Sequence, residues 1–87
     1  MKKLSDILAI TKKYGVSYIP NNNVMGFRFT TPNLDVANIH KCVEEIQETF
    51  HFRNLAYGQY KAWSKTYFPD GEGILGYEIV IDDQLEV

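Results

Sequence analysis

Side chains at the start of the chain recur at steps of three and four, the spacing that places them on one face of a helix. Ser5 is a suitable N-cap for this helix, and Gly15 is a suitable residue at which to end it. The pattern therefore predicts a short amphipathic helix at the start of the chain. Its buried stripe is expected to consist of Leu4, Ile7, Leu8, Thr11 and Tyr14.

Two β-rich runs follow, Val16–Ile19 and Val24–Thr30, and residues 20–23 between them have the composition of a turn. In the second run Phe27 and Phe29 alternate with smaller or polar residues. Because successive side chains of a strand point to opposite faces, this alternation predicts a half-buried strand with one apolar face.

The longest periodic segment runs from Leu34 to Phe50 and predicts a helix that packs one stripe against a sheet. Thr31 and Asn33 are both suitable N-caps, and the sequence does not choose between them. The expected buried stripe consists of Val36, Ile39, Val43, Ile46 and Phe50.

A second hairpin is expected from Leu55–Phe68 and Ile74–Asp82, with a turn at residues 69–73. The element order is therefore α-β-β-α-β-β. We predict one α+β domain over residues 1–87, a four-stranded antiparallel sheet with both helices packed on one face.

The register of the second hairpin decides which side chains face away from the helices, since a slip of one residue exchanges the two faces. A four-residue loop sets Tyr60 opposite Ile81 and Ala62 opposite Ile79. A five-residue loop would place Lys61 and Lys65 on the helix side, and burying two unpaired lysines is costly. We therefore expect the four-residue loop.

That register predicts an exposed patch rich in aromatic and apolar residues on the sheet face away from the helices. The patch can be a solvated surface, a protein-binding surface that includes self-association, or a single-stranded nucleic-acid surface on which bases stack. The predicted binding residues are Lys61, Trp63, Lys65, Tyr67, Ile74, Glu78 and Val80.

Charge and composition narrow these alternatives. The net charge is −2, but residues 69–87 carry six acidic residues and no basic one, which disfavours a polyanion as partner. The 87 residues contain no apolar run long enough for a membrane helix and no targeting segment, so we expect no membrane association. A single cysteine, Cys42, allows no internal disulfide and indicates a reducing, cytoplasmic location.

One segment bears on the nucleic-acid alternative. Gly26-Phe27-Arg28-Phe29 resembles the centre of the RNP1 motif of RNA-recognition domains. The resemblance covers these four residues and implies aromatic side chains available for base stacking. Met25 stands where that motif has a basic residue, and the chain is not assigned to the family.

Catalytic chemistry has little support in the sequence. His40, Glu44 and His51 lie along one stripe of the long helix, where a metal site is the alternative to a solvated face. Cys42 lies on a half-buried flank of the same helix without a visible base. We expect no enzyme, no metal and no cofactor.

The sequence therefore favours a small non-catalytic binding protein that acts through protein–protein contacts. A regulator or inhibitor of a larger partner fits, including one encoded by a phage or mobile element, and so does a homodimer. The first alternative is a single-stranded RNA or DNA binder. The second is a small enzyme or metal-dependent protein whose site is assembled across a dimer.

Overall fold

The computed structural model describes residues 2–20, 26–63 and 72–86, apart from the side chains of 61–63, 72, 74 and 75. Two helices and four strands follow one another in the order α-β-β-α-β-β, which confirms the predicted α+β class and element order. The elements are α1 (Leu4–Lys13), β1 (Ser17–Ile19), β2 (Phe27–Thr31), α2 (Val36–Phe50), β3 (Leu55–Trp63) and β4 (Glu72–Ile81).

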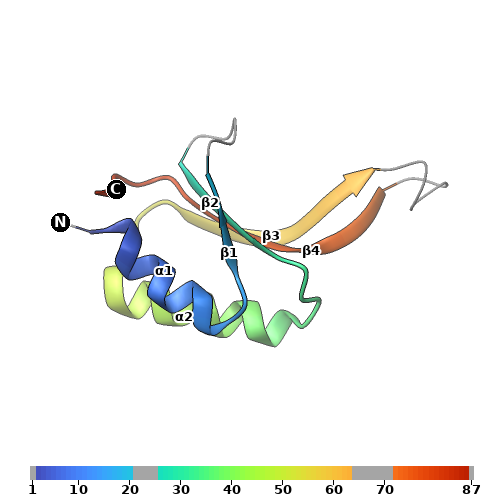
Figure 1. Ribbon diagram of the computed structural model, residues 1–87, viewed down its shortest axis with the longest axis horizontal. Helices are drawn as coiled ribbons and strands as arrows, with labels where there is room; N and C mark the ends of the chain where they lie inside the picture. Colours follow the sequence, from blue (N-terminus) through green and yellow to red (C-terminus); the bar gives the residue numbers. More distant parts are fainter. Residues whose placement is uncertain (1, 21–25, 64–71, 87) are drawn as a thin grey trace.

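The strands form one antiparallel sheet in the order β1-β2-β4-β3. β2 and β4 are therefore the central strands, and β1 and β3 form the two edges. Both helices lie on the same face of this sheet, as predicted (Figure 1). We call the opposite face, on which no helix of the described chain lies, the outer face.

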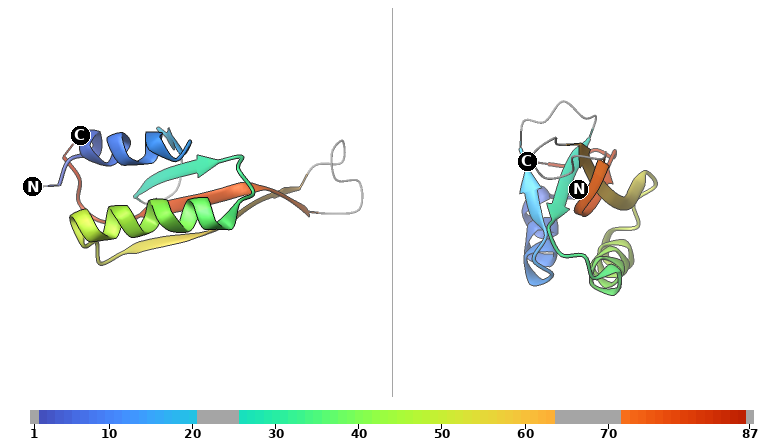
Figure 2. Two further views of the ribbon diagram at one scale, coloured as in Figure 1. Left: turned by 90° about the horizontal axis from the view of Figure 1, so that it is seen from below. Right: turned by 90° about the vertical axis from the view of Figure 1, so that its right-hand side faces the viewer.

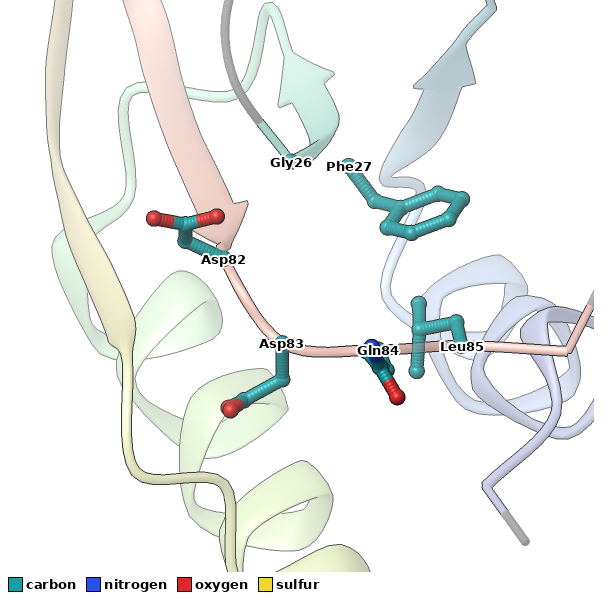
Figure 3. A pocket seen from close by; sticks show the side chains of 6 residues that line it. All are labelled: Gly26, Phe27, Asp82, Asp83, Gln84 and Leu85. Carbon is teal, nitrogen blue, oxygen red and sulfur yellow. The ribbon is translucent and has the colours of Figure 1, made fainter.

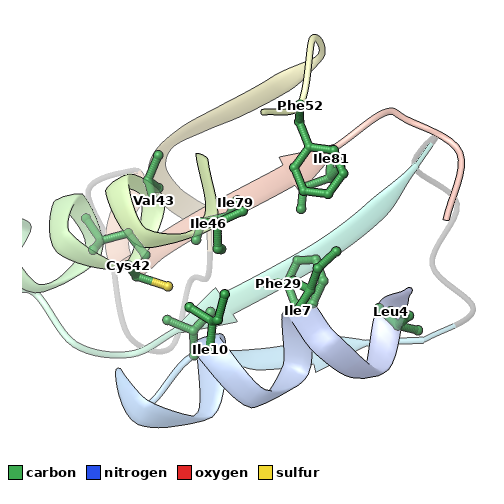
Figure 4. Close-up of a cluster of buried hydrophobic side chains, with 12 residues drawn as sticks. Leu4, Ile7, Ile10, Phe29, Cys42, Val43, Ile46, Phe52, Ile79 and Ile81 are labelled. Carbon is green, nitrogen blue, oxygen red and sulfur yellow. The ribbon is translucent and has the colours of Figure 1, made fainter. Parts of the chain in front are cut away.

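The core fills the space between the helices and the sheet. Ile7 of α1 and Ile46 of α2 are fully buried, as are Phe29 of β2 and Ile79 of β4. Their side chains point toward one another from all four elements (Figure 4). Burying a side chain of this size contributes roughly 1.5–3 kcal/mol, so this contact layer holds the helices to the two central strands.

The N-terminus of α1 differs from the expectation. Lys3, not Ser5, is the N-cap residue, and no side chain caps the helix. The first helical N–H, that of Leu4, donates instead to the carbonyl oxygen of Glu86 at 2.9 Å, and the N–H of Glu86 donates to the Lys2 carbonyl oxygen at 2.8 Å. Backbone near the C-terminus thus supplies the acceptor that a capping side chain would otherwise provide.

The helix α2 begins at Val36 and is capped by Asp35, whose carboxylate accepts a hydrogen bond from the N–H of Ala37 at 3.0 Å. The two predicted caps, Thr31 and Asn33, act earlier in the loop, where their side-chain oxygens accept from the N–H groups of Asn33 and Asp35. The helix therefore starts two residues later than predicted. Val36 consequently lies outside the core, 58% exposed.

A polar cluster joins the two helices beside the core. The carboxylate of Glu45 on α2 forms an ion pair with Lys13 and accepts a hydrogen bond from the Tyr14 hydroxyl at 2.9 Å. These contacts hold the pKa of Glu45 below its ordinary value and raise the pKa values of Lys13 and Tyr14 above theirs. Each shift favours the protonation state that the folded cluster requires.

The predicted register of the second hairpin is wrong. Ile81 lies opposite Leu55 and Ile79 lies opposite Tyr57, whereas the sequence predicted Tyr60 and Ala62 at those positions. The shift is an odd number of residues, so it exchanges the faces of β3. The odd-numbered positions from Leu55 to 59 therefore share the helix side with Ile79 and Ile81.

The reason lies in the length of the hairpin. The far ends of β3 and β4 run beyond both helices, as Figure 1 and the left view of Figure 2 show. A position on the helix side of this extension has no helix above it. The predicted register assumed that the helices cover the hairpin along its whole length, and they do not; Lys65 lies outside the described residues.

A close approach at Gly76 fixes β2 against β4. A Cβ atom at this position would stand 1.8 Å from the carbonyl oxygen of Thr31, and the φ angle is +156°. The register of β3 and β4 also slips here, since Tyr60 pairs with Gly76 and Lys61 with Ile74. Only glycine allows the backbone of β2 to pass this close to the bulge.

We expect Gly76→Ala to lower the free energy of unfolding by about 1–3 kcal/mol, because the added methyl group must push the backbone of β2 away. Thermal unfolding measures the loss. Gly58→Ala is the matched control, since a Cβ there meets nothing within 4 Å. Equal melting temperatures for the two variants would contradict the close approach.

The Glu45 cluster predicts a plateau of stability against pH. A lowered carboxyl pKa contributes stability that is lost as the pH falls below the ordinary value of 4.5. The raised pKa of Tyr14 contributes stability that is lost as the pH rises above 10.0. Glu45→Gln should therefore lower the melting temperature most between about pH 5 and pH 9.

The control for this variant is Glu48→Gln, an exposed position on the same helix. Its melting temperature should follow that of the wild type across the same pH range. If the loss of melting temperature in Glu45→Gln stays constant from about pH 3 to about pH 11, a range that extends at least about one unit beyond both ordinary pKa values, charge does not hold the helices together.

Candidate functional site

The register of β4 with both neighbours determines which side chains the outer face carries. Ile79 and Ile81 point into the core, so Glu78 and Val80 between them belong to the outer face. Their cross-strand partners belong there too. The described residues of this face include Arg28 and Thr30 of β2, Glu78 and Val80 of β4, and Ala56, Gly58 and Tyr60 of β3.

Arg28 is held in place on this face from two sides. Its Nε and Nη2 atoms both contact Oε2 of Glu78, at 2.8 and 2.7 Å. The guanidinium also lies over the ring of Tyr60, 4.8 Å from the ring centroid. Because the contacts come from β4 and β3, the three strands fix the position of one planar cation at the surface.

A shallow hollow of about 210 Å³ lies beside this cluster. Ala56 and Gly58 leave it open because they fill little space, and Val80 gives it an apolar wall. Glu78, which pairs with Arg28, also lines the hollow. The outer face thus combines a small apolar depression with a fixed cation and an aromatic ring.

The predicted binding residues are only partly brought together. Glu78 and Val80 lie on the outer face as expected, and Glu78 pairs with Arg28 of β2. At the backbone, Lys61 lies opposite Ile74 and Trp63 opposite Glu72. Their grouping with Glu78 rested on the register that is wrong. Lys65 and Tyr67 lie outside the described residues.

Sequence reasoning missed Arg28 and Tyr60 as members of the site. The alternation of Phe27 and Phe29 could have identified Arg28, because it directs Arg28 away from the core. The same alternation explains the segment that resembles RNP1. Phe29 is fully buried and Phe27 packs against the core, so the two rings are not offered to a ligand on the outer face.

A larger hollow of about 580 Å³ lies where β4 runs into the C-terminal segment. Figure 3 shows the side chains of Asp82 and Asp83 directed away from Phe27 and Leu85. One Asp83 oxygen accepts a hydrogen bond from the N–H of Asn54 at 3.1 Å. The carboxylates and the aromatic ring therefore do not converge on one ligand position.

The helical stripe considered for metal binding is engaged in other contacts. Nε2 of His40 lies 3.0 Å from a Glu44 carboxylate oxygen, and Nδ1 lies 3.1 Å from the Tyr57 hydroxyl. His51 is the C-cap residue, in a left-handed conformation with φ 55°. Among the described residues, no group of three or more His, Cys, Asp or Glu side chains is placed to hold a metal ion.

Cys42 is fully buried, which corrects the expected half-buried position. Its sulfur lies on the inner side of α2, among the core side chains (Figure 4). Burial raises the pKa of the thiol to about 11, with a further contribution from Glu45. The reactive thiolate is thus a minor species near neutral pH.

Comparisons with models of protein families, with curated proteins and with solved structures give no match. What the chain does is therefore inferred from its own geometry. Within the described residues, neither α1 nor α2 is long and apolar enough to cross a membrane.

Native Cys42 should react slowly with a thiol reagent at pH 8, because its sulfur is both buried and protonated. Timed mass spectrometry after alkylation measures the rate. Adding denaturant should restore the rate of an ordinary cysteine. Modification of the folded protein as fast as that of the denatured protein would contradict the buried position.

Proposed function

We propose that this chain is a non-catalytic protein-binding module whose contact surface is the outer face of the sheet. The observation that carries the proposal is the fixed position of Arg28 between Glu78 and Tyr60, beside the hollow at Val80. A regulator or inhibitor of a larger protein is the form of binding protein that this surface fits.

Arginine and tyrosine often dominate the energetics of protein interfaces. Their contribution is largest when little side-chain freedom is lost on binding. Arg28 and Tyr60 are half-buried and in contact before any partner arrives. The strands thus order these two side chains before binding, so less side-chain entropy is lost when a partner binds.

The hollow supports an apolar anchor as the partner's contribution. Ala56, Gly58 and Val80 present no charge, and a volume of about 210 Å³ suits one aliphatic or aromatic side chain better than an extended ligand. The carboxylate of Glu78 at its border can accept a hydrogen bond from the partner. An apolar centre with a polar border is the usual anatomy of a protein interface.

Single-stranded nucleic acid receives less support from this geometry. The charge of Arg28 is matched by Glu78 at 2.7 Å, so the described outer face offers little net attraction to phosphate. Phe27 and Phe29 face the helices, which removes the aromatic pair that a base could stack on.

A reducing, cytoplasmic setting suits the single buried Cys42.

Affinity capture from the native host tests the proposal, with wild type, Val80→Lys and Val36→Lys as baits. Val80→Lys places a charge in the wall of the hollow. Val36→Lys is the matched control, because Val36 is exposed on α2. We expect a protein retained in near-stoichiometric amount by wild type and Val36→Lys, and reduced at least tenfold, roughly 1.4 kcal/mol, on Val80→Lys.

Nuclease treatment before elution separates the two classes of partner. A partner released by nuclease would favour the single-stranded nucleic-acid alternative. Equal capture by all three baits would contradict the outer face as the contact surface. Circular dichroism of each bait checks that the comparison is between folded proteins.

A further inference from the structure

A second surface of the molecule has the properties of an interface, and it is the free edge of β3. This strand pairs with β4 on one side, and in the described part of the chain no strand pairs with its other side. It spans nine residues, Leu55–Trp63. An edge of this length presents a row of backbone donors and acceptors that another strand can use.

The two edges of the sheet differ in how they are protected. β1 has only three residues and is followed by Pro20, so it offers little to pair with. From Leu55 to Tyr60, β3 contains neither a proline nor a charged residue. Shortness, proline and charge are the usual devices against edge pairing, and this stretch of β3 has none of them.

The register slip near Tyr60 does not interrupt this edge. Tyr60 pairs with Gly76 and Lys61 with Ile74, so the extra residue belongs to β4. β3 therefore runs without a break from Leu55 to Trp63. A strand that is continuous and uncharged over most of its length can serve as a template along its whole edge.

We propose that two copies of this chain pair antiparallel through β3 and form one continuous eight-stranded sheet. A two-fold axis at Gln59, the middle residue of the strand, lets all nine residues of each copy pair. In this register Gly58 lies opposite the partner's Tyr60. An aromatic residue opposite a strand glycine stabilises the pair, and symmetry produces this contact twice.

Charge also favours a second copy as the occupant. The uncharged stretch Leu55–Tyr60 gives a second copy no like charge to meet at the centre of the pairing. Lys61 of one copy would lie opposite the partner's Tyr57, not opposite another lysine. Gly58 and Tyr60 belong both to this edge and to the outer face, but Gln59 is not an outer-face residue and Val80 lies on β4, so substitutions at these two positions test the two interactions separately.

Gln59 provides a sharp test because it is exposed and would lie opposite itself across the axis. In sedimentation equilibrium, the average mass of the wild type should rise from 10.1 kDa toward twice this value as the protein concentration is raised to about 0.5 mM. Gln59→Lys and Gln59→Glu should each weaken association about tenfold, because each places two like charges in contact. An equimolar mixture of the two variants should restore it.

Gln84→Lys and Gln84→Glu are the matched controls, at an exposed position away from β3; both should associate like the wild type. Restoration in the Gln59 mixture also shows that the variant chains are folded. A wild type that stays at 10.1 kDa overturns the proposal. So does association that the Gln59 variants leave unchanged, which would point to contact through another surface.

Discussion

The placement of β4 between β2 and β3 is the constraint on which the rest of the structure depends. Ile79 and Ile81 of this strand are fully buried against the helices, and each pairs with a residue of both neighbouring strands. This pairing fixes which side chains of all three strands point outward. The contact between Arg28 and Glu78, the hollow at Val80 and the free edge of β3 all follow from it.

The sequence predicted the elements well because each one has a local signal. The apolar period of α2, the alternation of Phe27 and Phe29 and the stop at Gly15 are properties of neighbouring residues, and all three appear in the structure. The N-caps were predicted less well. The acceptor at the start of α1 is the backbone of Glu86, more than eighty residues away, which local reasoning does not reach.

The candidate site was predicted only in part because it depends on long-range register. Glu78 and Val80 were placed on the outer face from the alternation of β4 alone. Assigning the faces of β3 required knowing how far the helices cover the hairpin, and that is a property of the assembled fold. Arg28 joins the site through a contact across fifty residues of chain, to Glu78.

The cross-strand pairing of β3 with β4 is therefore the quantity to measure, by nuclear Overhauser contacts between backbone protons of the two strands. We expect contacts that join Leu55 to Ile81 and Tyr57 to Ile79. Contacts that join Tyr60 to Ile81 and Ala62 to Ile79 would contradict it. They would exchange the faces of β3, and they would remove Tyr60 and the hollow from the outer face.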